Sequence, residues 1–380
     1  MISLSDVAAL PMRHVAGLMT GTSMDGLDVA LCRIGSAPLT FELLAFETVP
    51  LPTDLRRSLS AAALADVGAI ARANMALGHY YAAALADVLA RHPLELHLIG
   101  SHGQTVYHEH RLTTLQLGEP APLAARFGCP VIHDFRANDI AAGGAGAPLV
   151  PYVDYRLLAG RGEALLVVNI GGIANFTALP RDGGPDQVQG MDCGPGNMIL
   201  DLLVEACSGG SERFDRDGRL AARGRPLALL QELEQHPFFD EAPPKSAGRE
   251  QFGPDFVQGL IERVGPQDEQ TWCDLLATAV ELTAFGIDSA YRRHVAPRHT
   301  VDAVVVAGGG AHNPTLMARL GERFAPLPVR RSDQHGLPVD AKEAIAFAIL
   351  ASERVDRRPS NMPSVTGAKG PVLLGKITES

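Results

Sequence analysis

Long apolar stretches are missing from this chain of 380 residues, since no apolar run reaches the 18 residues that suggest a transmembrane helix. The first residues also lack the basic segment followed by an apolar segment that marks a secretory leader. We therefore expect a protein that does not associate with a membrane.

Cysteine is scarce as well. The five cysteines are odd in number, scattered and without a Cys-x-x-Cys pair: Cys32, Cys129, Cys193, Cys207 and Cys273. This usage argues against a disulfide framework and against a cysteine-based metal site. We expect reduced thiols and a cytoplasmic location.

Positive charge is in deficit, because 33 Lys and Arg face 43 Asp and Glu, for a formal net charge of −10. A negative protein is poorly suited to general binding of nucleic acid or of an anionic membrane, so neither is expected as a partner. Apolar residues make up 46% of the chain, and its length predicts two domains with a core each.

Glycine, by contrast, is plentiful and gathers in three turns. Residues 14–32 and 165–179 each predict a strand, a glycine turn and a second strand, and residues 303–317 predict a strand, three glycines and a helix. Glycine turns let backbone N–H groups surround an anion. Two such hairpins across a cleft would hold a polyphosphate, and the third turn would admit a nucleoside.

The remaining pattern predicts an α/β architecture. The expected elements are two helices within 55–91, a strand at 96–100, a helix at 121–127, a strand at 130–133, a helix at 197–207, a polar loop at 237–254, and helices at 271–293 and 340–353. The Gly-, Ala- and Pro-rich stretch 141–151 is the best candidate for a domain junction.

Several short strings, taken in order, resemble the anhydro-N-acetylmuramic acid kinase family. They are Gly21–Asp28, Ser101–Thr105, Asp134–Asp139, Gly146–Leu149, Asn169–Gly172, Met191–Asn197, Gly308–Asn313 and Asp340–Ala344. The resemblance implies an α/β fold of two actin/hexokinase-like (ribonuclease H-like) domains around an interdomain cleft. It implies an N-terminal domain at 1–145, a C-terminal domain with the nucleotide site at 146–350, and a segment at 351–380 that returns to the first domain.

The resemblance also implies an ATP- and Mg²⁺-dependent kinase of peptidoglycan recycling that acts as a homodimer. Water would open the ring of 1,6-anhydro-N-acetylmuramic acid at C1, and O6 would take the γ-phosphoryl group, giving N-acetylmuramic acid 6-phosphate. Two alternatives stay open. One is a kinase of another anhydrosugar such as levoglucosan, and the other is a nucleotide-switched binding protein of the Hsp70 or actin type.

This chemistry needs a carboxylate that takes a proton from water. Asp192, expected in a glycine turn just before a helix, is the predicted base. The alternative is an aspartate that only bonds backbone donors where a helix begins.

The family strings imply a set of nucleotide and phosphate contacts. They are Gly21, Thr22, Ser23, Met24, Asp25, Gly26, Leu27, Asp28, Gly171, Gly172, Gly309, Gly310 and Asn313. Asp25 and Asp28 are expected to hold Mg²⁺ through water. Plain hairpin or packing turns are the alternatives. Met19 and Asn169 stand where many members of the wider superfamily have an acidic residue, which leaves the metal-positioning carboxylate undefined.

His102, Arg136, Asp139 and Glu343 are the candidates for sugar binding. The planar fork of Arg136 suits the lactyl carboxylate of muramic acid, although a structural ion pair with Asp134 or Asp139 is the alternative. His102 is alternatively a satisfied buried histidine.

The loop at 244–250 resembles the family too, with Ala247 where threonine is usual. Its Lys245 and Arg249 are alternatively solvated charges.

Overall fold

A computed structural model describes residues 1–21, 24–36, 38–62, 65–265 and 268–380. The chain forms two compact units: unit 1 comprises Met1–Arg156 and Ala341–Ser380, and unit 2 comprises Leu157–Asp340. The sequence interpretation divided the chain at 145–146 and 350–351 instead. The difference arises because the last long helix packs on the sheet of unit 1, as described below.

Unit 1 is built on a six-stranded sheet in the order β13-β7-β4-β1-β2-β3. Its strands are β1 (Met12–Thr20), β2 (Gly26–Ser36), β3 (Leu39–Pro50), β4 (Leu98–Ser101), β7 (Val131–His133) and β13 (Lys376–Thr378). A separate hairpin is formed by β5 (Gln104–Glu109) and β6 (Thr113–Leu117). Its helices are α1 (Leu4–Ala9), α2 (Thr53–Ser60), α3 (Val67–Arg91), α4 (Ala121–Phe127), α5 (Ala137–Ala141), α6 (Val150–Leu158, which runs across the boundary), α14 (Lys342–Val355) and α15 (Pro363–Thr366).

Unit 2 is built on a five-stranded sheet in the order β10-β9-β8-β11-β12. Its strands are β8 (Leu165–Ile170), β9 (Ile173–Leu179), β10 (Gln189–Pro195), β11 (Ala303–Ala307) and β12 (Val329–Arg331). Its helices are α7 (Asn197–Cys207), α8 (Arg219–Arg223), α9 (Leu230–Leu233), α10 (Arg249–Phe252), α11 (Pro254–Val264), α12 (Glu269–Ala290) and α13 (Pro314–Phe324), with 3₁₀ turns η4 (Pro237–Asp240) and η6 (Gly309–His312) among them.

Both units repeat one strand topology. In unit 1, β1, β2 and β3 form an antiparallel meander, and β4 and β7 extend it in parallel from β1. In unit 2, β8, β9 and β10 form the meander, and β11 and β12 extend it in parallel from β8. This is the ribonuclease H-like arrangement expected from the sequence, so the α/β fold class is confirmed within each unit. The third strand of each meander was not predicted.

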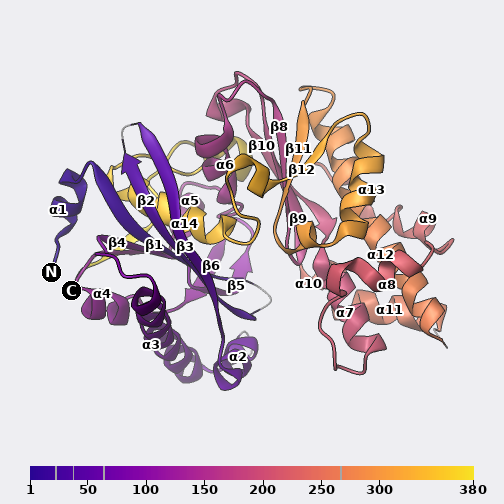
Figure 1. The fold of residues 1–380 in the computed structure, drawn as a ribbon, viewed down its shortest axis with the longest axis horizontal. Coiled ribbons are helices and arrows are strands. Elements are labelled where there is room, and N and C mark those ends of the chain that lie inside the picture. Colours follow the sequence, from indigo (N-terminus) through magenta and orange to yellow (C-terminus); the bar gives the residue numbers. More distant parts are fainter. Residues whose placement is uncertain (22–23, 37, 63–64, 266–267) are drawn as a thin grey trace. The chain divides into compact units, whose positions relative to one another are not determined.

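Helix α14 lies directly on the sheet of unit 1, against β1, β2 and β4 (Figure 1). Glycine permits this close approach. A Cβ added at Gly17 would lie 1.9 Å from the Ala344 carbonyl oxygen, and one at Gly100 would lie 2.2 Å from that of Phe347. The helix therefore belongs to unit 1 although its sequence follows unit 2.

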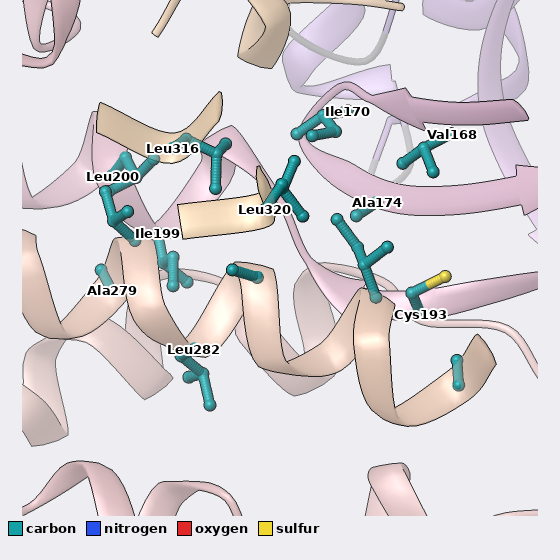
Figure 2. Close-up of a cluster of buried hydrophobic side chains, with 14 of the residues drawn as sticks. Val168, Ile170, Ala174, Cys193, Ile199, Leu200, Ala279, Leu282, Leu316 and Leu320 are labelled. Carbon is teal, nitrogen blue, oxygen red and sulfur yellow. The ribbon is translucent and has the colours of Figure 1, made fainter. Parts of the chain in front are cut away.

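The core of unit 2 gathers side chains from the sheet and from α7, α12 and α13 (Figure 2). Val168, Ile170 and Cys193 contribute from the strands, while Leu282 contributes from α12. Continuous apolar strands buried on both faces are typical of sheets covered by helices. This packing fixes the ends of β8 and β10, where the site residues of unit 2 lie.

The stretch at 237–254, expected as a polar loop, is partly helical. It contains η4 and α10, and its Phe238, Phe239 and Phe252 are buried. The three rings contact one another, with Phe285 of α12 against Phe239. Aromatic burial therefore outweighs the turn-forming prolines and glycines that predicted a loop.

Candidate functional site

Asp192 lies in strand β10 rather than in the glycine turn expected from the sequence. It pairs with Asn175 of β9, and the register shifts immediately afterwards, so that Gly194 is the next paired residue. A bulge of this kind re-aims side chains. Gly194 has a φ of 132°, and a Cβ there would lie 2.8 Å from the Phe239 ring, so glycine suits this position.

The carboxylate of Asp192 is half-buried and accepts a hydrogen bond at Oδ2 from the Ala247 N–H, at 2.9 Å. Burial raises its pKa to about 6, although the Ala247 N–H and the charge of Lys245 both lower it. A carboxylate with this pKa is ionised at neutral pH yet basic enough to accept a proton. Its neighbour Cys193 is fully buried in the core of unit 2.

The glycine turn between β8 and β9 supports the segment that follows Asp192. The carbonyls of Gly171 and Gly172 accept hydrogen bonds from the N–H groups of Gly196, Asn197 and Met198, at 2.7–3.1 Å. These donors begin helix α7 and would otherwise lack partners. Among the described residues, a Cβ on Gly171 would meet only the Ile173 carbonyl oxygen within 4 Å, at 3.8 Å, so they leave the outer side of this turn open.

The third glycine turn packs tightly on the end of β8. Gly308 has a φ of 79°, and a Cβ there would lie 2.8 Å from Asn169 Oδ1. A Cβ on Gly310 would lie 2.4 Å from the Ile170 side chain. Asn313 is buried and caps α13, because its Oδ1 accepts from the Leu316 N–H at 3.1 Å. Nucleotide contact by these residues stays a prediction.

The glycine-rich loop of unit 1 is described only in part, since Thr22 and Ser23 lie outside the described residues. Met24 has a φ of 52°, and its N–H bonds the Gly21 carbonyl at 3.1 Å. Gly26 has no room for a side chain, because a Cβ would lie 2.6 Å from Thr48. Leu27 is fully buried, so only its backbone could face a ligand.

His102 and Arg136 form a single unit of polar contacts. His102 is buried, and its Nδ1 donates to the Gly103 carbonyl at 2.7 Å. Its Nε2 accepts from Nε and Nη2 of Arg136, at 3.1 and 2.9 Å. Burial, followed by the charge of Arg136, lowers the pKa of His102 to about 3. The imidazole is therefore neutral at neutral pH and acts as an acceptor that holds the guanidinium.

Arg136 also donates from Nη1 to the Gly146 carbonyl at 2.9 Å. Burial lowers its pKa to about 10, while the charge of Glu343 on α14 raises it. Asp134, one ion-pair partner considered for Arg136, pairs with Lys376 at 2.7 Å. The guanidinium is thus a half-buried cation whose orientation is set by His102 and Gly146.

Asp139 is the candidate that the structure places least favourably for substrate contact. Its carboxylate is fully buried and accepts from the Gly146 N–H, Asn361 and Thr366, at 2.8–2.9 Å. These bonds tie the 142–149 loop to the segment after α14. Asp139 therefore links parts of unit 1, through partners other than Arg136.

Two polar atoms near His102 have unused hydrogen-bonding capacity. Ser101 Oγ and Gln104 Oε1 are buried and have no hydrogen-bond partner among the described residues. Unpaired buried polar atoms are rare because they cost free energy, so a bound polar molecule is the usual explanation. Neither residue was singled out from the sequence, although both belong to the Ser101–Thr105 string.

The chain matches the family model for anhydro-N-acetylmuramic acid kinase over residues 13–380. It belongs to this family. The relative from Salinibacter ruber with that name is 43% identical, with 96% of each chain covered. The relative from Caldanaerobacter subterraneus with the same name is 40% identical over 96% of this chain and 97% of its own.

Solved structures match over most of the chain at much lower identity. The component A of (R)-2-hydroxyglutaryl-CoA dehydratase from Acidaminococcus fermentans is 12% identical, covers 90% of this chain and 99% of its own, and has a TM-score of 0.46. No inference about the site rests on this likeness.

As a member of the anhydro-N-acetylmuramic acid kinase family, the protein is a phosphotransferase that acts on an anhydro sugar and uses ATP. None of the helices in the described ranges combines the length and apolar character that a membrane span requires. The described part of the chain also contains no group of three His, Cys, Asp or Glu arranged to hold a metal ion.

The carboxylates of Asp25 and Asp28 form a donor set that fits the Mg²⁺ that kinases use. Mg²⁺ keeps several waters and takes one or two carboxylates together with substrate phosphates, so it needs no preformed protein cage. Asp25 is exposed, and Asp28 accepts from Thr48 Oγ1 at 2.6 Å within the meander of unit 1. The two carboxylates suit contacts through water.

Lys245 was considered from the sequence as a solvated charge, but it is only 7% exposed. Its Nζ donates to the Phe238 carbonyl at 2.9 Å and lies 4.2 Å from the centre of the Phe238 ring. The adjacent phenylalanines of η4 were the signal that could have revealed this, since a cation is readily buried over an aromatic face.

Proposed function

We propose that this chain couples hydrolytic opening of 1,6-anhydro-N-acetylmuramic acid to phosphorylation of O6, with Asp192 as the general base. The observation that carries the assignment is the half-buried Asp192 carboxylate, with a pKa of about 6 and one oxygen held by the Ala247 N–H. Water attacks C1, Asp192 takes its proton, and the C1–O6 bond breaks. O6 forms a bond to the γ-phosphorus of ATP, and ADP leaves.

We assign the phosphates to the glycine turns. The open outer side of Gly171 and the backbone of residues 21–28 are suited to close approach by anionic oxygens. Gly309 and Gly310 are assigned to the nucleoside. Mg²⁺, held through water by Asp25 and Asp28, would supply positive charge that offsets the developing charge on the phosphates.

Sugar binding is assigned to Arg136, Glu343 and the vicinity of His102. Arg136 would bind the lactyl carboxylate in the orientation set by His102 and Gly146. Glu343 is half-buried near the amino end of α14, and its charge acts on Arg136. Ser101 Oγ would donate a hydrogen bond to a sugar hydroxyl or accept one from it, and Gln104 Oε1 would accept one. We further propose a cytoplasmic homodimer.

The test is incubation with ATP, Mg²⁺ and the anhydro sugar in oxygen-18 water. We expect a 6-phosphorylated product with one label at C1. Unlabelled product would reject hydrolytic opening, and absence of product would reject the substrate.

Levoglucosan, which has no lactyl group, serves as the comparison substrate. Arg136→Glu should raise KM for anhydro-N-acetylmuramic acid roughly a hundredfold, because a charge-assisted pair is replaced by repulsion. Any activity on levoglucosan should change much less. Equal losses on both substrates would contradict the assignment of Arg136.

A further inference from the structure

Lys245 and Ala247 belong to one short segment between η4 and α10, and this segment contacts η4 through Lys245 and strand β10 through Ala247. Lys245 bonds the Phe238 carbonyl and lies over the Phe238 ring. Ala247 donates its N–H to Asp192 Oδ2. A single residue, Ser246, therefore separates the buried cation from the donor that holds the proposed base.

The anchor of this cation is rigid. Phe238 and Phe239 are almost fully buried, and Phe239 packs against the Gly194 position of β10. Gly286 of α12 also lies close, since a Cβ there would be 2.7 Å from the Cys193 carbonyl oxygen and 3.0 Å from Phe239. One aromatic pair thus supports both the bulge after Asp192 and the ammonium of Lys245.

The charges around the two groups can be named. The charge of Lys245 acts on Asp192, and both Asp192 and Lys245 act on Cys193. Burial is the main influence on the pKa of each of the three groups. Cys193, Glu241, Arg293 and Asp192 act on Lys245, and Lys245 in turn acts on His294. Lys245 is the cation of this group that acts directly on Asp192, so removing it should change the proton affinity of that carboxylate.

We propose that Lys245 is a positioning residue for the reaction, because it fixes the 245–247 segment so that the Ala247 N–H holds Asp192 Oδ2 and leaves Oδ1 to take the proton from water. Among the described residues, Oδ1 has no hydrogen-bond partner. The proposal rests on the proposed function of Asp192. Lys245 acts through the carboxylate and touches no substrate.

The two roles of Lys245, anchor and charge, are separated by two substitutions. Lys245→Gln keeps a donor for the Phe238 carbonyl but removes the charge. Lys245→Met keeps the aliphatic stem and removes both the hydrogen-bond donor and the charge. Lys376→Met is the matched control, because it removes a cation whose ion-pair partner is the Asp134 carboxylate of unit 1.

The readout is the pH dependence of kcat/KM together with KM for ATP. For Lys245→Gln we expect the acid limb to move up by roughly 0.5–1 pH unit, because a nearby positive charge favours the ionised carboxylate. For Lys245→Met we expect the same direction and a kcat lower by roughly tenfold or more, because the carboxylate loses its fixed orientation. KM for ATP should change less than twofold in both.

Lys376→Met should leave the acid limb in place. An unmoved limb in both Lys245 variants would overturn the proposal, since a structural role alone lowers the amount of active enzyme at every pH without shifting the profile. If circular dichroism shows that Lys245→Met does not fold, the acid limb of the Lys245→Gln profile tests the proposal by itself. Loss of the proposed function itself is recognised separately, because Asp192→Asn would then retain near-normal turnover.

Discussion

At the scale of single residues, the site depends on side chains whose protonation is fixed by burial. The pKa of Asp192 is raised to about 6, while the pKa of His102 is lowered to about 3, so that its imidazole is neutral. In each case burial is the largest cause of the shift. The two residues therefore respond to pH in different ways, and each response is measurable.

The rate should fall on the acid side of Asp192. Since the base acts only when ionised, kcat/KM is expected to decrease tenfold per pH unit below about 6, where the carboxylate becomes protonated. Asp192→Asn should lower kcat by roughly a thousandfold or more while nucleotide affinity, measured by calorimetry, changes little. A mutant with near-normal turnover would contradict the assignment.

Stability should respond to His102. The pKa of His102 is depressed to about 3 in the folded chain, against an ordinary value of 6.5. The stabilisation that comes from keeping His102 neutral is therefore complete above pH 6.5 and is lost as the pH falls towards 3. Between pH 7 and pH 5 the free energy of unfolding should fall by roughly 2 kcal/mol through this residue.

His102→Gln retains polar groups without a titrating ring, so its free energy of unfolding should depend less on pH over that interval. Denaturant titrations at pH 7 and pH 5 measure the difference. An equal pH dependence in the two proteins would refute it.

At the scale of helices and strands, local pattern predicted most elements. The helices at 121–127 and 197–207 match α4 and α7, because apolar periodicity and flanking turn residues define such ends. Asp192 was misplaced because a bulged strand and a turn share the same glycines. The burial of Lys245 and the pairing of His102 with Arg136 depend on residues brought together by the fold, which no local pattern contains.

The contact of α14 with the sheet gives a prediction for one glycine. In Gly17→Ala, the new methyl would collide with the Ala344 carbonyl, so unfolding free energy should fall by about 1–3 kcal/mol or more. Activity should fall as well, since Glu343 and Phe347 lie on the displaced helix, and Phe347 packs on His102.

Gly259→Ala in α11 is the control, because a Cβ there meets no atom of the described residues within 4 Å. Its expected effect is neutral to stabilising by roughly 0.5–1 kcal/mol. Similar losses in both variants would show that the close approach at Gly17 is unimportant.

At the scale of the whole molecule, the chain leaves unit 1 after Arg156 and returns at Ala341. Ion pairs within unit 1 join the segment where the chain leaves the unit to the segment where it returns. Lys342 of α14 pairs with Asp154 of α6 at 2.8 Å, both almost fully buried, and Arg156 pairs with the buried Glu353 at 3.2 Å. The sequence predicted a return of the last segment but not these contacts, because the members of each pair are more than 180 residues apart.

Lys342→Met should destabilise the protein by about 3–5 kcal/mol, because it removes a buried partner from the Asp154 carboxylate. The double variant Lys342→Met/Asp154→Leu should recover much of that loss, because no charge is then left buried. Thermal and denaturant unfolding of the four proteins in this cycle measure the coupling. Additive effects would mean that the pair is not linked energetically.

The late position of α14 in the sequence has a consequence for biosynthesis. As the polypeptide leaves the ribosome, β1 and β4 are made early, yet the helix that covers Gly17 and Gly100 is translated only after all of unit 2. During that time the apolar face of the unit 1 sheet that α14 covers stays uncovered. Nascent chains of this protein are therefore expected to need chaperone protection until α14 has left the ribosome.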